Sequence, residues 1–568
     1  MEAAAKVADR PAVLDGRRSI TFKELDAECW RLAAGLERIG VGPGVRAALL
    51  VPPGIDFISL TFALLRCGAV PVLIDPGIGW ENVGRCLAEA EPQAFIGSTK
   101  AHLARLAGGW GKGSIRSMVT VGRKWGWGGL NLTDLYKTAS SPDGTAAPRR
   151  EAAGVGAFGA DFGKDKTAAI LFTSGSTGAP KGAVYTHGIF AHQAAMLREH
   201  FQIEPGGYSI PTFPLFALFD VALGLSAIIP RMDPTRPARV DPREIVLPIQ
   251  AHGAVQLFGS PALLDAVSRY GESHGARLPS LKRVICAGAP VPAKVLARLA
   301  RMLSPEAEIH TPYGATEALP VACITGSEVL AQTAVMTGEG RGICVGRPWS
   351  GMEVKVIGIS DDPIPAWSAA LCVPAGEIGE IVVKGPVVTR EYFHRPEATA
   401  LAKISEPDGA VRHRMGDVGY LDETGRLWFC GRKSHRINAL PETLFTIPCE
   451  GVFNQHPWVR RSALVGMAAG TCGTLDAAGA QIPVLCVELE PGADRDRVRR
   501  ELLEMAQRFA HTRSIQTVLF HPGFPVDVRH NAKIFREKLA VWAKGHMTVS
   551  TFPEGGQCQR TPVRRRVT

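Results

Sequence analysis

Residues 173–182 of this chain read Thr-Ser-Gly-Ser-Thr-Gly-Ala-Pro-Lys-Gly, and the apolar run Ala-Ala-Ile-Leu-Phe at 168–172 directly precedes them. Glycine lacks a Cβ, so the backbone at these glycines can fold around an anion with its N–H groups pointing inward. The hydroxyls and the lysine add further donors. The stretch therefore predicts a strand that leads into a phosphate-binding loop, and the residues expected to hold a nucleoside triphosphate are Thr173, Ser174, Gly175, Ser176, Thr177, Gly178 and Lys181.

The spacing of this loop differs from that of a Walker A loop. A Walker A loop needs Gly-x4-Gly-Lys followed by Ser or Thr, whereas Pro180 stands five residues after Gly175 in this chain. A glycine- and serine-rich turn that binds no ligand is the alternative interpretation. Other segments of the chain must decide between the two.

The composition is that of a globular protein with more than one core. The 568 residues are 46% hydrophobic and 21% charged, which excludes disorder and fibres and fits one large domain plus a smaller one. The body of the chain is only mildly basic, so nucleic-acid binding is not indicated. Four positive charges of the net +10 come from the last nine residues, at Arg560, Arg564, Arg565 and Arg566.

The twelve cysteines are scattered singly from Cys29 to Cys558, and no Cys-x-x-Cys pair occurs. This spacing suggests neither a zinc site nor a disulfide framework, and a reducing cytoplasm fits it best. The first ten residues carry acids and lack an apolar core, unlike a signal peptide. The most apolar windows, 47–75 and 215–230, contain prolines or charges, so we expect no transmembrane segment.

Short β-rich runs alternate with helix-like stretches along most of the chain. Residues 47–51 and 70–74 are typical of strands, and residues 22–39 are typical of a helix. This alternation predicts an α/β fold with largely parallel strands. We expect a large multi-layered N-terminal domain that spans residues 1–432.

After Arg432 the pattern becomes more compact. A strand is expected at 484–489, followed by a helix whose apolar positions are Val498, Leu502, Met505 and Phe509. The sequence therefore predicts a small α+β domain at 433–545 and a basic, flexible tail at 546–568.

The phosphate loop resembles that of the adenylate-forming superfamily, which includes acyl-CoA synthetases, luciferases and the adenylation domains of nonribosomal peptide synthetases. Further segments match this superfamily in the same order along nearly the whole chain. They are Ala-Gly-Ala-Pro at 287–290, Tyr-Gly-Ala-Thr-Glu at 313–317, a segment at 376–385 that reads as a hairpin, Gly-Asp at 416–417, Gly-Arg at 431–432 and Asn-Ala-Lys-Ile-Phe-Arg at 531–536.

The resemblance implies a large N-terminal domain that binds ATP and Mg²⁺ and a small C-terminal domain that rotates after adenylation. Thr177 and Glu317 would hold Mg²⁺, and Lys533 would bridge the substrate carboxylate and the α-phosphate. Together these three form the expected catalytic set. The hinge of the rotation would be Ser434, where relatives commonly carry Asp or Lys. The remaining residues expected to bind ATP are Gly288, Ala289, Pro290, Tyr313, Gly314, Thr316, Asp417 and Arg432.

The chemistry implied is activation of a carboxylate. The carboxylate attacks the α-phosphorus of ATP in line, pyrophosphate leaves, and an acyl-adenylate remains, so the enzyme contributes positioning and charge neutralisation. Residues 213–225 are mainly apolar, as a fatty-acyl pocket requires, although core packing explains them equally well. The residues expected to line the acyl pocket are Phe216, Ala217, Phe219 and Leu223.

Two departures argue against an ordinary CoA ligase. Many such ligases carry His at the position of Ala217, and their Lys-rich loop after Arg432 is replaced here by 437–448. Together with 213–220, 232–237 and 431–436, these features are similar to the β-lactone synthetase subfamily of bacterial long-chain olefin biosynthesis.

That resemblance implies that a 2-alkyl-3-hydroxy fatty acid is adenylated and that its own 3-hydroxyl then closes a β-lactone, so no thiol is needed. The partners that the resemblance implies are a thiolase, a hydroxy-acyl reductase and an α/β-hydrolase of the same pathway. Two alternatives stay open. One is a fatty acyl-CoA or acyl-AMP ligase, and the other is an inactive adenylate-binding protein.

Overall fold

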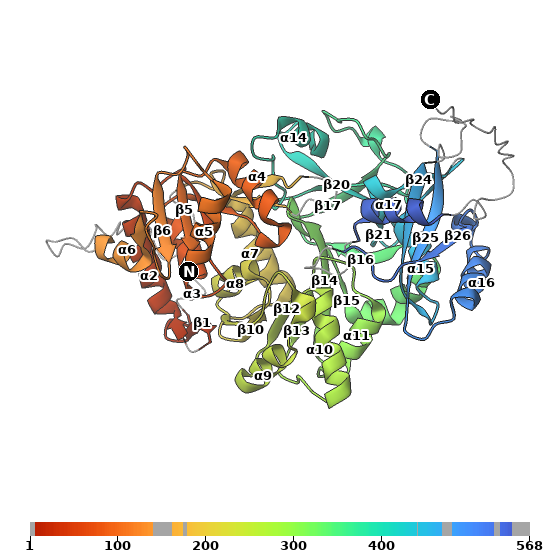
Figure 1. Cartoon of the computed structure of the whole chain (residues 1–568), viewed down its shortest axis with the longest axis horizontal. Helices are drawn as coiled ribbons and strands as arrows, with labels where there is room; N and C mark the ends of the chain where they lie inside the picture. The colour runs from red at the N-terminus through yellow and green to blue at the C-terminus, as the bar shows by residue number, and fades with distance from the viewer. Residues whose placement is uncertain are drawn as a thin grey trace, which may run out of the picture.

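The computed structural model of the chain describes residues 6–16, 18–139, 162–173, 179–439, 441–468, 480–526 and 534–547. Most of the predicted phosphate loop (174–178, with Thr177) and the predicted catalytic Lys533 lie outside the described residues. Figure 1 shows the N-terminal elements at one end of an elongated molecule and the last strands and helices at the other.

The first layer is an N-terminal sheet whose described strands run in the order β7, β6, β5, β3, β4, β8, β9. Among these strands β8 and β9 pair antiparallel, whereas the others pair parallel. The strands are β3 (Arg46–Leu50), β4 (Val70–Leu73), β5 (Ala94–Ser98), β6 (Ser117–Val121), β7 (Leu130–Asn131), β8 (Thr167–Phe172) and β9 (Gly182–Thr186).

Helices cover this sheet because each buries one apolar face. Helix α2 begins at a capping box in which the Thr21 hydroxyl accepts from Glu24 N and the Glu24 carboxylate accepts from Thr21 N at 2.8 Å. Its buried Leu32 and Leu36 share one apolar cluster with Ile58 of α3. The helices are α2 (Phe22–Arg38), α3 (Ile55–Arg66), α4 (Trp80–Ala90), α5 (Thr99–Gly108) and α6 (Leu132–Ala139).

The second layer is a larger sheet in the order β17, β18, β20, β21, β16, β15, β14, β13, β12, β10, β11, β1, β2, with β19 paired to β20. From β14 to β1 its strands are parallel, and the others pair antiparallel. The parallel strands are β1 (Pro11–Asp15), β10 (Tyr208–Pro211), β11 (Ser226–Ile229), β12 (Gln256–Gly259), β13 (Arg283–Cys286) and β14 (Glu308–Ala315).

The antiparallel strands of this sheet carry most of the later motifs. They are β2 (Arg18–Thr21), β15 (Ala318–Thr325), β16 (Ile343–Pro348), β17 (Glu353–Ile357), β18 (Gly379–Lys384), β19 (Lys403–Ser405), β20 (Val411–Leu421) and β21 (Leu427–Arg432). The helices between the strands are α7 (His187–Phe201), α8 (Pro214–Ala222), α9 (Arg243–His252), α10 (Pro261–His274), α11 (Ala293–Ala300), α12 (Gly326–Glu328), α13 (Ala334–Gly338) and α14 (Pro396–Ala402).

The two sheets bring their carboxyl ends to neighbouring positions. The segment after β3 and the ends of β1, β10 and β11 line one pocket. The turn at 287–290 follows β13 at the same edge of the larger sheet, because β10 to β13 are parallel. In open α/β sheets this edge is where ligands bind.

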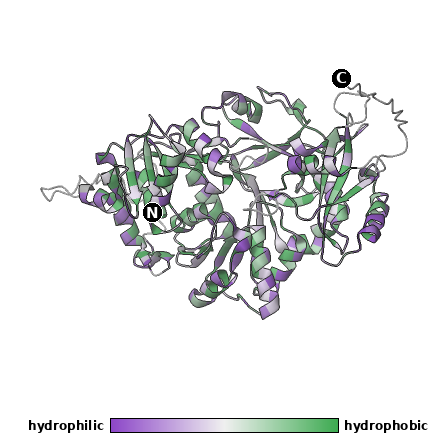
Figure 2. Ribbon diagram, viewed as in Figure 1, coloured by the Kyte–Doolittle hydropathy of each residue, from purple (hydrophilic) through white to green (hydrophobic). Residues whose placement is uncertain are grey.

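The C-terminal part has its own sheet of β24, β25 and β26 and a two-stranded sheet of β22 and β23. Its elements lie together at one end of the molecule in Figure 1, and the ribbon of α16 is mainly purple, or hydrophilic, in Figure 2. They are β22 (Ile437–Ala439), β23 (Glu442–Leu444), α15 (Thr446–Phe453), β24 (Val459–Ala468), β25 (Gln481–Leu489), α16 (Arg495–Ala506), β26 (Thr517–Phe520) and α17 (Arg536–His546).

Helix α15 packs closely against the large part of the molecule. A Cβ on Gly451 would lie 2.3 Å from the carbonyl oxygen of Thr337, so only glycine permits this approach. The large and small parts are therefore in contact at α13 and α15. The boundary expected after Arg432 coincides with the end of β21, and the mobility of the small part stays a prediction.

Two local expectations are wrong. The expected hairpin at 376–385 is instead the single strand β18, which pairs with β17 and β20. Helix α16 ends at Ala506, so Phe509 lies outside it. Within the described residues, no helix combines the length and the apolar character that a bilayer crossing requires.

Candidate functional site

The predicted phosphate loop connects two paired strands. Phe172 at the end of β8 lies opposite Gly182 at the start of β9. Thr173 N donates to Lys181 O at 2.9 Å, and Lys181 N donates to the Thr173 hydroxyl at 3.4 Å. These two residues hold the base of the loop, and residues 174–178 between them lie outside the described part.

The predicted adenine turn is a tight backbone turn at the end of β13. Ala287 N donates to Gly259 O at 3.3 Å, which ties the turn to β12. Gly288 has a φ of +99°, a conformation that side-chain-bearing residues rarely adopt. The local sequence Ala-Gly-Ala-Pro therefore suits the turn, and Ala289 and Pro290 follow it toward α11.

Tyr313, Asp417 and Arg432 come together from three strands. Asp417 on β20 lies directly opposite Arg432 on β21, and Arg432 Nη1 donates to Asp417 Oδ1 at 2.6 Å. The Tyr313 hydroxyl donates to the other carboxylate oxygen, Oδ2, at 2.6 Å. Tyr313 is 104 positions from Asp417 in the sequence, and Arg432 is 15 positions from it, yet the three side chains form one connected polar group.

The charges and the burial of this polar group shift the pKa values of its members. The Asp417 carboxylate beside Arg432 raises the pKa of the guanidinium above its ordinary value. Burial, and then the charge of Asp417, raise the pKa of the Tyr313 hydroxyl well above its ordinary value. Tyr313 is therefore a hydrogen-bond donor at neutral pH, and Asp417 is a fixed carboxylate that can accept hydroxyl donors from a ligand.

The rest of the 313–317 segment is fixed by backbone contacts. A Cβ on Gly314 would lie 2.7 Å from the carbonyl oxygen of Ala318, so the segment needs glycine there for packing as well. The Tyr185 hydroxyl donates to Thr316 O at 2.5 Å. The carbonyl of Glu317 accepts from Thr389 N at 2.9 Å and from its hydroxyl at 3.0 Å.

The Glu317 carboxylate lies in a polar cluster that the sequence did not reveal. The Tyr392 hydroxyl donates to Glu317 Oε1 at 2.6 Å, and Lys181 Nζ lies 5.1 Å from the centre of the Tyr392 ring. Lys403 Nζ donates to the Thr389 hydroxyl at 3.1 Å. Tyr392 thus lies between the predicted pyrophosphate lysine and the predicted Mg²⁺ carboxylate.

Lys403 is a buried lysine, 7% exposed. Burial lowers its pKa to about 7, although the Glu317 carboxylate opposes this change. No motif predicts Lys403 or Tyr392, because neither belongs to a spaced pattern. Only the folded structure shows that Lys403 belongs to this cluster, because the short strand β19 places it against β20.

The expected hinge residue, Ser434, is exposed in a single turn between β21 and β22. One neighbour holds this turn to the large part of the molecule and the other holds it to the small part. Lys433 Nζ lies 3.1 Å from Glu380 Oε1, and His435 Nε2 lies 3.3 Å from Glu537 Oε1 on α17. The turn therefore contacts the large part through an ion pair and the small part through a hydrogen bond, and its role as a hinge stays a prediction.

The four expected acyl-pocket residues do not share one face of the structure. Phe216 stacks on Phe258 with ring centres 3.5 Å apart, and Phe219 and Leu223 belong to the same apolar cluster. Ala217 faces the other way, into the cluster of the N-terminal part. Helical geometry explains the difference, because Phe216 and Phe219 are three residues apart on α8 and Ala217 is not on their face.

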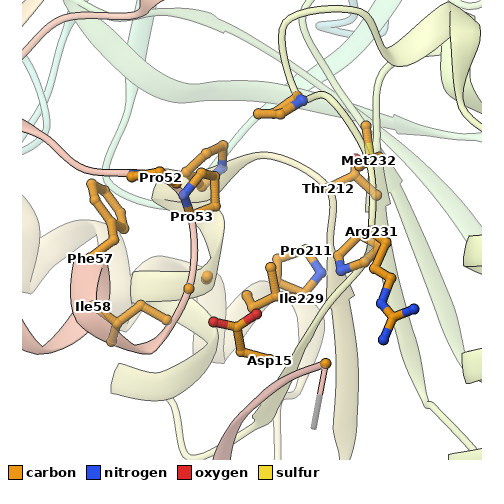
Figure 3. A pocket seen from close by; sticks show the side chains of 16 residues that line it. Asp15, Pro52, Pro53, Phe57, Ile58, Pro211, Thr212, Ile229, Arg231 and Met232 are labelled. Atoms are coloured by element: carbon orange, nitrogen blue, oxygen red, sulfur yellow. The ribbon is translucent and has the colours of Figure 1, made fainter. Parts of the chain in front are cut away.

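Ala217 lines a pocket of about 290 Å³ between the two sheets. In Figure 3 Pro52, Pro53 and Phe57 lie on one side of it, and Ile229 and Met232 lie on the other. The walls are mainly apolar, and Asp15 and Arg231 are its charged members. A mainly apolar cavity with a few polar groups is typical of a small-molecule site.

The sequence matches known proteins over most of its length. Residues 1–393 match the family described as AMP-binding enzyme. The chain is 49% identical over 532 residues to the olefin beta-lactone synthetase of Xanthomonas campestris pv. campestris, a match that covers 92% of this chain and 91% of that protein.

Solved structures show the same fold. The amide bond synthetase McbA from Marinactinospora thermotolerans superposes with a TM-score of 0.76 at 22% identity, covering 95% of this chain and 98% of the other. The O-succinylbenzoate coenzyme A synthetase of Bacillus subtilis, solved in complex with ATP and magnesium ion, superposes with a TM-score of 0.71 at 20% identity, covering 95% of this chain and 98% of the other.

Proposed function

The chain belongs to the AMP-binding enzyme family, and we propose that it converts a 2-alkyl-3-hydroxy fatty acid into a β-lactone through an acyl-adenylate. The observation that carries this proposal is the 49% identity, over 92% of the chain, to a protein named olefin beta-lactone synthetase. The polar group around Asp417 and the cluster around Glu317 supply the carboxylates that the first half of this reaction needs.

In the first half-reaction, a carboxylate oxygen of the fatty acid bonds to the α-phosphorus of ATP and pyrophosphate leaves. Asp417 would accept the ribose hydroxyls, and Tyr313 and Arg432 hold that carboxylate in place. Lys181 would face the departing pyrophosphate, and Lys533 would bridge the two reacting groups. These contributions are positional and electrostatic.

Mg²⁺ would be held by Thr177 and Glu317. Carboxylate and hydroxyl oxygens are the hard ligands that this ion takes together with phosphate oxygens, so the Glu317 carboxylate fits that role chemically. When bound, the ion neutralises negative charge on the phosphates. The hydrogen bond from Tyr392 fixes one Glu317 oxygen and so orients the carboxylate.

In the second half-reaction, the 3-hydroxyl oxygen attacks the acyl carbonyl carbon of the adenylate. The bond to AMP breaks, AMP leaves as the anion, the hydroxyl proton is released, and a four-membered ring closes. The nucleophile arrives as part of the substrate, and effective molarities of well-oriented intramolecular reactions reach about 10⁵–10⁸ M. No external thiol is then required.

The apolar substrate chains have two candidate locations. One is the pocket of about 290 Å³ beside Ala217, and the other is the aromatic face of α8 that carries Phe216 and Phe219. A 2-alkyl-3-hydroxy acid has two long branches, so two apolar surfaces on opposite faces of one helix suit it. We propose that each surface takes one branch.

A fatty acyl-CoA or acyl-AMP ligase is the second candidate function, and the apolar pocket beside Ala217 favours it equally. AMP release from ATP, followed with matched acids with and without the 3-hydroxyl, separates the two. The β-lactone proposal expects steady AMP release without CoA only for the 3-hydroxy acid. AMP release that depends on CoA and is equally fast for the acids with and without the 3-hydroxyl would favour the ligase. If no acid supports AMP release, the chain is an inactive adenylate-binding protein.

A further inference from the structure

Two histidines and a cysteine from distant parts of the sequence lie together at the end of α7. They are His200 in the last turn of α7, His310 on β14 and Cys323 on β15. One possible ligand atom from each lies within 4.8 Å of the other two. Imidazole nitrogen and thiolate sulfur are the ligands that zinc prefers.

The strand register explains why His310 and Cys323 meet. His310 lies opposite Thr325 across the β14–β15 pair, and Pro312 lies opposite Cys323. His310 and Cys323 are therefore diagonal neighbours on one face of the sheet. The end of α7 crosses this face, because the ring of Phe201 packs edge-on against His310 with centres 4.8 Å apart.

The surroundings orient the rings and leave polar atoms unsatisfied. The His200 ring stacks on Trp349 with centres 3.9 Å apart and planes 13° apart, which restricts its rotation. Within the described residues, Nδ1 of His310 is buried without a hydrogen-bond partner. Such atoms are rare in folded proteins and call for a ligand, a water or an ion.

We propose that His200, His310 and Cys323 form a binding site for Zn²⁺, with water in the fourth position. With Zn–N near 2.1 Å and Zn–S near 2.3 Å, tetrahedral donors lie about 3.4–3.6 Å apart. The present separation of up to 4.8 Å must therefore shrink by roughly 1 Å. His200 is exposed and can slide along the face of Trp349 on which its ring stacks, whereas the other two residues are on paired strands.

Metal binding releases one proton to solvent, because the Cys323 thiol binds the ion as thiolate. The two imidazoles bind through neutral nitrogen and release none. The proposal is independent of the proposed function, because it concerns no residue expected to bind ATP or substrate. It also departs from the expectation drawn from cysteine spacing, since the three ligands are 13 to 123 positions apart in the sequence.

The test is a titration of the metal-stripped full-length protein with Co²⁺, a spectroscopic substitute for Zn²⁺ that gives a charge-transfer band when bound to thiolate. One equivalent should produce the band, and Zn²⁺ should abolish it. C323S should lose the band, and H310N and H200Q should each weaken binding at least tenfold. H200Q alters an exposed side chain, so the fold should tolerate it.

The matched control is C372S, which removes an exposed cysteine and should leave the titration unchanged. Circular dichroism of every variant shows that the fold is retained. The proposal is overturned if no saturable one-to-one binding occurs. It is equally overturned if C323S keeps the band, or if H200Q binds Co²⁺ as tightly as the natural chain.

Discussion

The Tyr392 hydroxyl donates a 2.6 Å hydrogen bond to Oε1 of Glu317, 75 positions earlier in the sequence. Burial, and then the charge of Glu317, raise the pKa of that hydroxyl above its ordinary value, so it remains a donor at any physiological pH. Hydrogen bonds to charged groups are worth about 1.5–3 kcal/mol. Tyr392 therefore positions the carboxylate that we expect to bind Mg²⁺.

Removing this hydroxyl tests that role. Y392F should lower the rate of adenylation about tenfold and should raise the Mg²⁺ concentration needed for half-maximal rate. Pyrophosphate release, measured over a range of Mg²⁺ concentrations, gives both quantities. Y270F alters a tyrosine at the distant helix α10 and should change neither. An unchanged Mg²⁺ requirement in Y392F would show that the bond does not orient Glu317 for the ion.

Asp417 should contribute mainly to ATP binding. D417N removes the charge that Arg432 and Tyr313 surround, and we expect the KM for ATP to rise tenfold or more while kcat changes less. Steady-state kinetics of AMP formation measure both constants. D408N changes an exposed carboxylate paired with Lys384 and is the control. A large loss of kcat with the KM for ATP unchanged would assign Asp417 to another step.

Lys533 should matter to one half-reaction only. K533A should slow adenylation by about two to four powers of ten, the effect of removing one key electrostatic donor. Closure of the β-lactone from chemically prepared acyl-adenylate should continue, because the resemblance implies that Lys533 leaves the site before that step. K538A, at an exposed lysine of α17, is the control. Adenylation by K533A at the natural rate would refute the assignment.

Asp220 should make stability depend on pH. Burial raises the pKa of Asp220 to about 7 in the folded protein, against 3.8 when unfolded. Between these values the folded state binds more protons, so the stability contributed by Asp220 is present at low pH and is lost as pH rises toward 7. The stability of the natural chain relative to D220N should fall by up to about 1.4 kcal/mol per pH unit from pH 5 to 7.

Thermal unfolding of both proteins at pH 5, 6 and 7 measures this difference. The melting temperature of the natural chain should drop relative to that of D220N as pH rises. Melting temperatures that shift in parallel would mean that Asp220 is ionised throughout. The orphaned Oδ2 of Asp220, buried without a partner among the described residues, is the structural reason to expect the effect.

The sequence predicted those helices and strands that are determined by interactions between residues close in the sequence. Helix α2 has a capping box and an apolar stripe, and strands β3 and β4 are short apolar runs, so each was predicted nearly to its ends. Phe509 follows the helical spacing of the apolar residues and was therefore predicted to lie in the helix, yet the helix ends at Ala506. Spacing alone cannot place a helix end when no capping residue marks it.

Only those residues of the candidate site that belong to a sequence motif could be predicted. Tyr313, Asp417 and Arg432 belong to recognisable segments, and the structure brings them within hydrogen-bonding distance. Tyr392 reaches Glu317 from a segment that forms isolated bridges to Ala183 and Ala318, and Lys403 reaches Thr389 from the short strand β19. Contacts of this kind depend on the register of the whole sheet, which no short window of sequence contains.

The most direct test of the central claim is the identity of the lipid product. The purified protein is incubated with ATP, Mg²⁺ and a long-chain 2-alkyl-3-hydroxy acid in the absence of CoA, and the extracted lipid is examined by proton NMR kept cold. We predict a β-lactone formed in equal amount to the AMP released. An acyl-adenylate that accumulates, and that becomes a thioester when CoA or a thiol carrier is added, would contradict the account and identify a ligase.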